Sequence, residues 1–154
     1  SCGREMTLSS DVQALLDNLD GSGSDSERDA VRELRKQSNW PELLLAKYKR
    51  SRHWNERVAC VFYAMRSAHD NAAAFELGLS ALGDRSGVVR YRATMLLAYA
   101  QNIDAVGPLK ELLDRGLSVE DARAAIDAIE SKNHNFFVDR MHSGKIKMNI
   151  VEAR

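Results

Sequence analysis

Apolar residues recur every three or four positions along most of the chain. Val12, Leu15, Leu16 and Leu19, for example, share one face if residues 12–19 are helical. The spacing continues to residue 132 and is broken only at short polar clusters such as 20–24. It predicts an all-α fold with helices over 12–19, 24–38, a segment that starts at Trp40, 55–69, 71–82, 88–101, 103–113 and 119–132.

Residues at the predicted helix starts support these boundaries. Ser24 with Glu27, and Ser118 with Asp121, have the three-residue spacing of a capping box. In that motif the serine hydroxyl accepts a hydrogen bond from a backbone N–H of the first helical turn. Pro41 fits the first turn of its helix, where its missing N–H interrupts no helical hydrogen bond.

Three arginines recur at a fixed interval of 33 residues. Each is followed three and six positions later by apolar residues, and the sets are Arg57 with Cys60 and Tyr63, Arg90 with Ala93 and Leu96, and Arg123 with Ile126 and Ile129. A repeat of this length built from helices indicates stacked helix pairs, none of which buries its apolar face alone. We therefore expect a right-handed α-solenoid of about nine helices, forming a single domain over residues 9–142.

One stretch of the chain resembles a known repeat family. Residues 82–90, with Ala93, Leu97 and then 102–109, are similar to the short bacterial HEAT repeat, the type also called phycobilisome-lyase-like. The resemblance rests on residue identities over 82–113, and on the 33-residue spacing over 40–81 and 114–132. The valine before the repeat arginine is replaced by Glu56 in the first repeat and by Ala122 in the third.

The resemblance implies a structural role for the repeat arginines. In the family, the equivalent arginine bonds to the aspartate of its repeat and to neighbouring turns. Asp84 would then bind Arg90, and Asp114 or Glu120 would bind Arg123, with Arg57 in the same role. The alternative is that Arg57, Arg90 and Arg123 form a ladder for phosphate groups.

Charge is balanced overall but not evenly distributed. The chain has 22 basic and 22 acidic residues, yet residues 36–69 carry 7 basic and 2 acidic ones. A cluster of cations beside a tryptophan can bind phosphates or an acidic protein surface, or can be a solvated turn. The candidate partner-binding residues are Lys47, Lys49, Arg50, Arg52, Trp54 and Arg66.

The sequence carries no recognisable catalytic motif. The four histidines form no His-x-x-x-His or His-Glu pair, so we expect no metal and no cofactor. Cys60 occupies an apolar repeat position, which predicts a buried and unreactive thiol. Two cysteines without a disulfide pattern, and no apolar run long enough to span a membrane, favour a cytoplasmic protein that is not an enzyme.

Two functional hypotheses follow from these patterns. The first is a protein–protein interaction module with an acidic partner, specifically a small bacterial immunity or adaptor protein that covers its partner's surface. The second is a nucleic-acid-binding or DNA-lesion-processing protein that uses the basic band 47–66, with Trp54, Asp84 and Arg90 available to a glycosylase-like cleft. Zero net charge argues against the second.

The two ends of the chain differ from the helical pattern. Residues 1–8 are expected to be a disordered start or a cloning remnant. In residues 143–154, Ile146, Met148 and Ile150 alternate with polar residues, which is strand periodicity. This tail either caps the last helix pair with its apolar face or completes its strand with a partner or a second copy.

Overall fold

We describe residues 8–133 of a computed structural model of the 154-residue chain. All regular structure in this range is helical, which confirms the predicted all-α fold. The elements are α1 (Ser10–Asp17), α2 (Asp25–Leu34), α3 (Trp40–Arg50), α4 (Trp54–Ala64), the 3₁₀ turn η1 (Met65–Ser67), α5 (Ala72–Ala81), α6 (Gly87–Ala100), the 3₁₀ turn η2 (Ile103–Ala105), α7 (Val106–Asp114) and α8 (Val119–Glu130).

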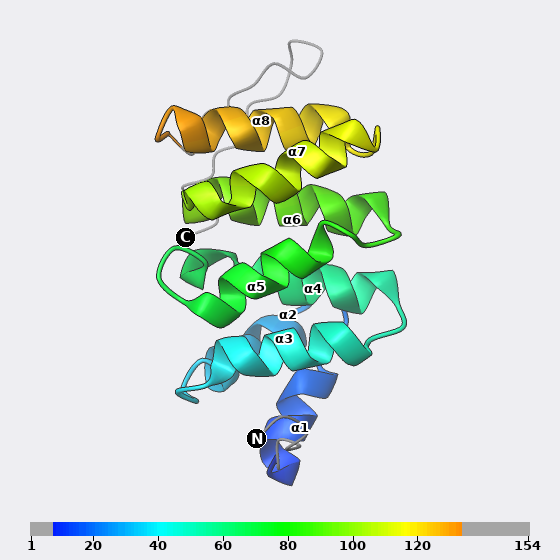
Figure 1. Cartoon of the computed structure of the whole chain (residues 1–154). Coiled ribbons are helices and arrows are strands. Elements are labelled where there is room, and N and C mark those ends of the chain that lie inside the picture. The colour runs from blue at the N-terminus through cyan, green and yellow to red at the C-terminus, as the bar shows by residue number, and fades with distance from the viewer. Residues whose placement is uncertain (1–7, 134–154) are drawn as a thin grey trace, which may run out of the picture.

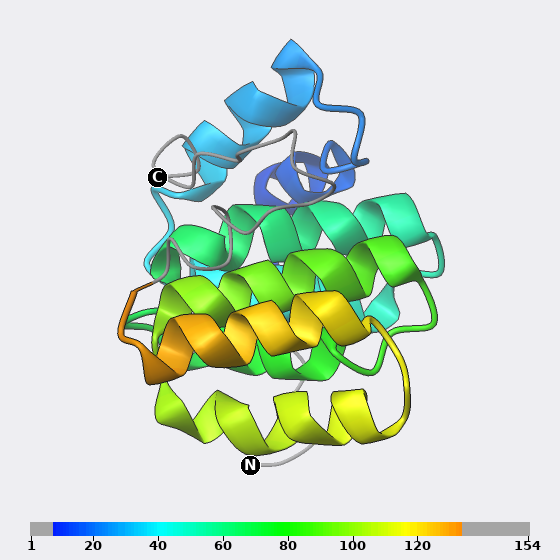
Figure 2. The ribbon, with the colours of Figure 1, turned by 90° about the horizontal axis from the view of Figure 1, so that it is seen from above.

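From α3 to α8 the helices stack in chain order, with α1 at the opposite end of the stack from α8 and α2 behind α3 and α4 (Figure 1). Helices α3 and α4, α5 and α6, and α7 and α8 pack as consecutive pairs, and α4, α6 and α8 also contact one another in succession. Seen along the stack, α8 overlies α6 and α7 lies to one side (Figure 2). The helix pairs occur where the 33-residue spacing predicts them, while the right-handed solenoid path and the family resemblance stay predictions.

The turns that join the two helices of each pair lie along one edge of the stack. These are residues 51–53, 82–86 and 115–118, all on the right of Figure 1. Every helix of the pairs thus has one end at this edge, and side chains near the turns of successive pairs come close together. This placement decides where the candidate site forms.

One predicted capping box is confirmed in its serine half, and the other is wrong. The Ser24 hydroxyl accepts from the Glu27 N–H at 3.1 Å, and the buried Glu27 carboxylate accepts from the N–H groups of Gly21 and Gly23. Ser118 instead has a left-handed backbone, with φ of 47°, and makes no capping hydrogen bond. Its hydroxyl accepts from Arg90, and this bond takes the place of the cap.

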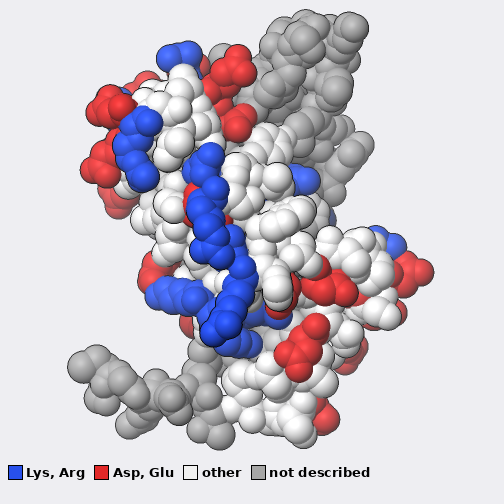
Figure 3. All heavy atoms as spheres, turned by 90° about the vertical axis from the view of Figure 1, so that its right-hand side faces the viewer, with Lys and Arg blue, Asp and Glu red and all other residues white. Residues whose placement is uncertain are grey.

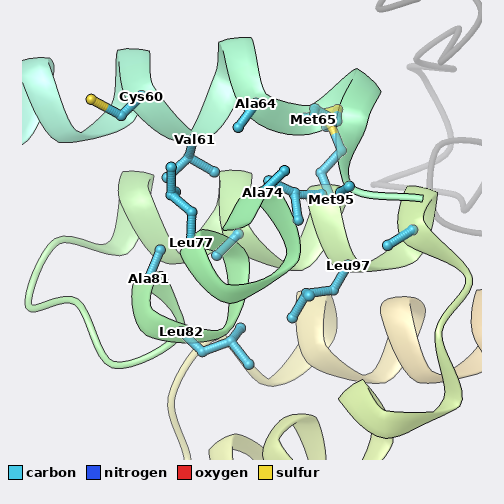
Figure 4. Close-up of a cluster of buried hydrophobic side chains, with 14 of the residues drawn as sticks. Cys60, Val61, Ala64, Met65, Ala74, Leu77, Ala81, Leu82, Met95 and Leu97 are labelled. Carbon is cyan, nitrogen blue, oxygen red and sulfur yellow. The ribbon is translucent and has the colours of Figure 1, made fainter. Parts of the chain in front are cut away.

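The core is formed by apolar side chains on the facing sides of the helix pairs. Val61, Leu77 and Leu97 come together from α4, α5 and α6 (Figure 4). Gly78 lets α5 approach α6 closely, since a Cβ there would overlap the Leu96 side chain. Cys60 is fully buried, as its repeat position predicts, and this burial raises the pKa of its thiol to about 12.

Both ends of the chain fall outside the described residues. These are residues 1–7 and 134–154. The expected disordered start, the strand-like tail 143–154 and the two roles weighed for that tail therefore stay predictions.

Candidate interaction edge

A buried ion pair joins the first two turns of this edge. Arg57 lies in the first half of α4 and is only 5% exposed. Its guanidinium is bidentate on Asp84, with Nε 2.8 Å from Oδ2 and Nη2 3.0 Å from Oδ1. Its Nη1 donates to the backbone carbonyls of Ser51 and Arg52, at 3.4 and 2.9 Å. One side chain therefore links the α3–α4 turn to the α5–α6 turn.

Asp84 accepts hydrogen bonds on both of its carboxylate oxygens. Besides the two from Arg57, it accepts from the Tyr48 hydroxyl at 2.9 Å and from the Ser86 N–H at 2.9 Å. Burial raises the pKa of the Asp84 carboxyl, but the hydrogen bonds from Arg57, Ser86 and Tyr48 together outweigh it and hold that pKa below its usual value. Asp84 is therefore ionised and fully paired at neutral pH.

This geometry corrects the predicted partner of Asp84. The carboxylate binds Arg57 of the preceding helix pair, 27 residues earlier, and not Arg90 of its own pair. Arg90 donates through Nη1 to the Asp84 backbone carbonyl at 2.8 Å and through Nε to the Ser118 hydroxyl at 3.0 Å, 28 residues later. Each arginine thus binds the turn before its own helix and reaches forward to the next turn.

Arg123 does not repeat this arrangement. Its side chain is exposed on α8 and makes no hydrogen bond or ion pair with another described residue. Asp114 and Glu120, its predicted partners, are exposed as well. The physical reason is that no further helix pair follows α8 in the part of the chain described, so no next turn supplies an acceptor.

Two of the six predicted partner-binding residues do not belong to the edge. Lys47 is buried, with 4% exposure, and its Nζ is 3.2 Å from Glu56 Oε1, so it is inaccessible to a partner. Arg66 follows α4 and lies roughly 18 Å along that helix from Trp54, near Arg35 at the opposite edge. The continuous band expected over residues 47–66 is therefore wrong.

The other four residues lie together at the α3–α4 turn. Lys49, Arg50, Arg52 and Trp54 are all exposed, and Trp54 is 53% exposed. They are joined by two arginines that the sequence analysis did not select, Arg85 in the second turn and Arg115 in the third. We call the five exposed cations the basic edge, which consists of Lys49, Arg50, Arg52, Arg85 and Arg115.

Basic side chains form a column along this edge. Figure 3 shows Lys and Arg atoms running over the successive turns, with acidic atoms on either side. Arg85 Nη2 donates to the Arg52 carbonyl at 3.2 Å, so the first two turns are in direct contact. Arg85 lies 33 residues after Arg52, and the repeat interval itself would have located it.

The arginines of the basic edge lack acidic partners among the described residues. Arg50, Arg52, Arg85 and Arg115 form no salt bridge there, whereas Arg28, Arg32 and Lys36 on α2 and its flank each pair with a carboxylate three residues away. Lys49 pairs with Glu76 at 3.1 Å, and both side chains are more than half exposed. The edge therefore presents cationic groups that the described fold does not neutralise.

A pocket of about 410 Å³ opens between the first two turns. It is lined by Tyr48, Lys49, Ser51, Arg57, Gly83, Asp84 and Arg85. No group of three His, Cys, Asp or Glu residues suited to a metal ion occurs within residues 8–133. No helix in that range has the length and apolar character needed to cross a membrane.

Comparisons with known proteins do not identify a relative. No protein-family model and no curated protein matches the sequence, and no solved structure matches the fold.

The depressed pKa of Asp84 predicts a pH-dependent contribution to stability. Since the folded-state pKa lies below the unfolded value of about 3.9, the contribution is present above that pH and is lost as pH falls through the folded-state pKa. Asp84→Asn should lower the free energy of unfolding by about 3 kcal/mol at pH 7. Urea unfolding of both proteins should show this difference shrinking below about pH 4. A difference that is absent at pH 7, or unchanged at pH 3, would contradict the assignment.

The unequal environments of the repeat arginines predict unequal effects of alanine. Arg90→Ala removes bonds to two turns and should lower the free energy of unfolding by about 1–2 kcal/mol. Arg123→Ala is the matched control and should change it by less than about 0.5 kcal/mol, because this side chain is exposed. Thermal and urea unfolding measure both values. Equal losses in the two variants would show that Arg90 is not a bridge.

Proposed function

We propose that this chain is a non-enzymatic protein-binding module, a HEAT-like helical-repeat protein that binds an acidic protein surface through its basic edge. The observation that carries the proposal is the set of exposed arginines without described acidic partners on three successive turns. In an ordinary solvated surface, cations and carboxylates alternate and pair, as they do on α2.

The framework beneath the edge favours binding by preorganisation. Arg57 and Arg90 bond successive turns to one another, so the backbone that carries Arg52 and Arg85 is held in place. The backbone at these arginines is thus already ordered before a partner binds, so binding costs less conformational entropy. Arginine and tryptophan are also the residue types that dominate binding energy at protein interfaces, and Trp54 is exposed beside Arg52.

A protein partner is favoured over nucleic acid by the shape of the charged region. The basic column is narrow and is flanked by acidic atoms (Figure 3), and the chain carries no net charge. A nucleic-acid module has a basic excess over the whole domain. The hypothesis of a glycosylase-like cleft is weakened further, because the Asp84 carboxylate is buried and bound by Arg57 and Tyr48 and so is not accessible as a base.

The biological role within this proposal is that of a small bacterial immunity or adaptor protein that covers part of its partner. We place it in the reducing cytoplasm, which suits a free thiol such as Cys60. The partner is expected to be a protein whose contact surface is acidic, because that surface has to neutralise the arginines of the basic edge.

Charge reversal on the basic edge tests the proposal. The wild-type chain is used to capture a partner, identified by mass spectrometry, and the dissociation constant is measured with purified proteins. Arg50→Glu, Arg52→Glu and Arg85→Glu combined should weaken binding at least about a hundredfold. The midpoint of thermal unfolding should change little, since exposed charges contribute about 0–1 kcal/mol.

The matched control reverses three other exposed cations. Arg28→Glu, Arg32→Glu and Lys36→Glu change the net charge by the same amount but lie on or next to α2. Binding should survive in this control. If both triple variants lose binding equally, only net charge matters and the edge is not the site. If the captured species is an oligonucleotide whose affinity falls steeply with salt, the nucleic-acid function replaces the one proposed.

A further inference from the structure

The pocket between the first two turns has a floor that is already neutralised. Arg57 and Asp84 form a bidentate pair there, and Arg57 Nη1 is occupied by backbone carbonyls. Tyr48 donates to Asp84, and burial together with that hydrogen bond raises the pKa of its hydroxyl, so it stays protonated. The floor therefore neither repels a single negative charge strongly nor competes for it.

The rim of the pocket carries cations with donors to spare. Arg85 is held by the bond from Nη2 to the Arg52 carbonyl, and its Nε and Nη1 have no partner among the described residues. The Nε and Nη1 N–H groups point from different edges of the guanidinium, so each can donate a charge-assisted hydrogen bond to a carboxylate oxygen. Lys49 completes the rim, and its exposed pair with Glu76 is of a kind that contributes little and exchanges readily.

Gly83 lines the pocket, although neither its backbone conformation nor its neighbours require a glycine there. Gly83 has no positive φ, and a Cβ built on it would meet nothing closer than the Ser80 carbonyl oxygen at 3.7 Å. A side chain at this position is therefore compatible with the backbone and with its described neighbours. Because Gly83 lines the pocket, we expect a large side chain at this position to reduce the space at its opening.

We propose that this pocket binds one carboxylate of the acidic partner, the side chain of a glutamate or an aspartate, through Arg85 and Lys49. This inference rests on the proposed function and adds that recognition is anchored at one position and is not spread evenly over the column. A singly charged carboxylate suits the site better than a phosphate dianion, because the Asp84 carboxylate lies in the floor.

The probe is a fluorescein-labelled peptide of twelve alternating glutamate and glycine residues, with a glutamine–glycine peptide as the uncharged control. Fluorescence anisotropy at low salt gives the dissociation constant. Gly83→Leu changes no charge, yet it should weaken binding of the glutamate peptide about tenfold by filling the pocket. Arg85→Ala should weaken it at least as much, and the glutamine peptide should not bind.

Two variants serve as matched controls. Gly107→Leu makes the same change at another glycine with open space around it, outside the pocket. Arg32→Ala removes one exposed charge from α2, outside both the basic edge and the pocket. Both should leave the dissociation constant within about twofold of wild type. In an amide correlation spectrum, the signals of Ser51 and Gly83 should shift when the peptide is added to wild type.

The outcomes separate the pocket from the proposed function. If Gly83→Leu binds the peptide as wild type does, or if a phosphoserine–glycine peptide binds more tightly than the glutamate peptide in a Gly83-dependent way, the carboxylate pocket is overturned. The pocket is also overturned if wild type does not bind the glutamate peptide. The proposed function is tested separately, by the identity of the captured partner and by its response to the triple reversal of Arg50, Arg52 and Arg85 and to the control reversal on α2.

Discussion

The buried pair of Arg57 and Asp84 is the interaction on which the described architecture of this edge depends. An arginine in an apolar stack is costly unless its donors are paired, and here a carboxylate and two carbonyls from neighbouring turns accept four hydrogen bonds from the five N–H groups. The pair therefore specifies how the second helix pair sits against the first. A shift between the pairs would leave two buried charges without partners.

Arg90 shows the same principle with neutral acceptors. It joins the second turn to the third through a carbonyl and the Ser118 hydroxyl, and Ser118 adopts a left-handed backbone there. The two arginines use offsets of 27 and 28 residues to the next turn. The arginine that bonds one turn to the next thus recurs with the repeat, although its acceptor in the next turn differs.

Much of the fold was predictable because helical spacing and the 33-residue interval are local or periodic signals. The helix pairs and the burial of Cys60 follow from them directly. The partner of Asp84 was not predictable in the same way. Asp84 precedes Arg90 by six residues and follows Arg57 by 27, and the sequence alone favours the nearer arginine. Arg57 comes close to Asp84 only because the second helix pair packs on the first.

Only part of the candidate site was predictable, because the sequence does not show how the helix pairs pack on one another. A run of cations in the sequence does not show which of them point outward, and Lys47 is buried against Glu56 while Lys49 and Arg50 are exposed. Arg85 belongs to the edge because turns one repeat apart are neighbours in space. The composition of the basic edge therefore depends on the three-dimensional arrangement, in which successive turns lie side by side and are joined by hydrogen bonds.

A double-mutant cycle on Arg57 and Asp84 tests the central claim most directly. The free energy of unfolding is measured by urea titration for wild type, Arg57→Met, Asp84→Ala and the double variant. If the two side chains bridge the turns as a unit, the double variant should be more stable than the sum of the single losses allows, by about 2 kcal/mol or more. Losses that add to within about 0.5 kcal/mol would show that the two residues act independently, and would contradict the bridge.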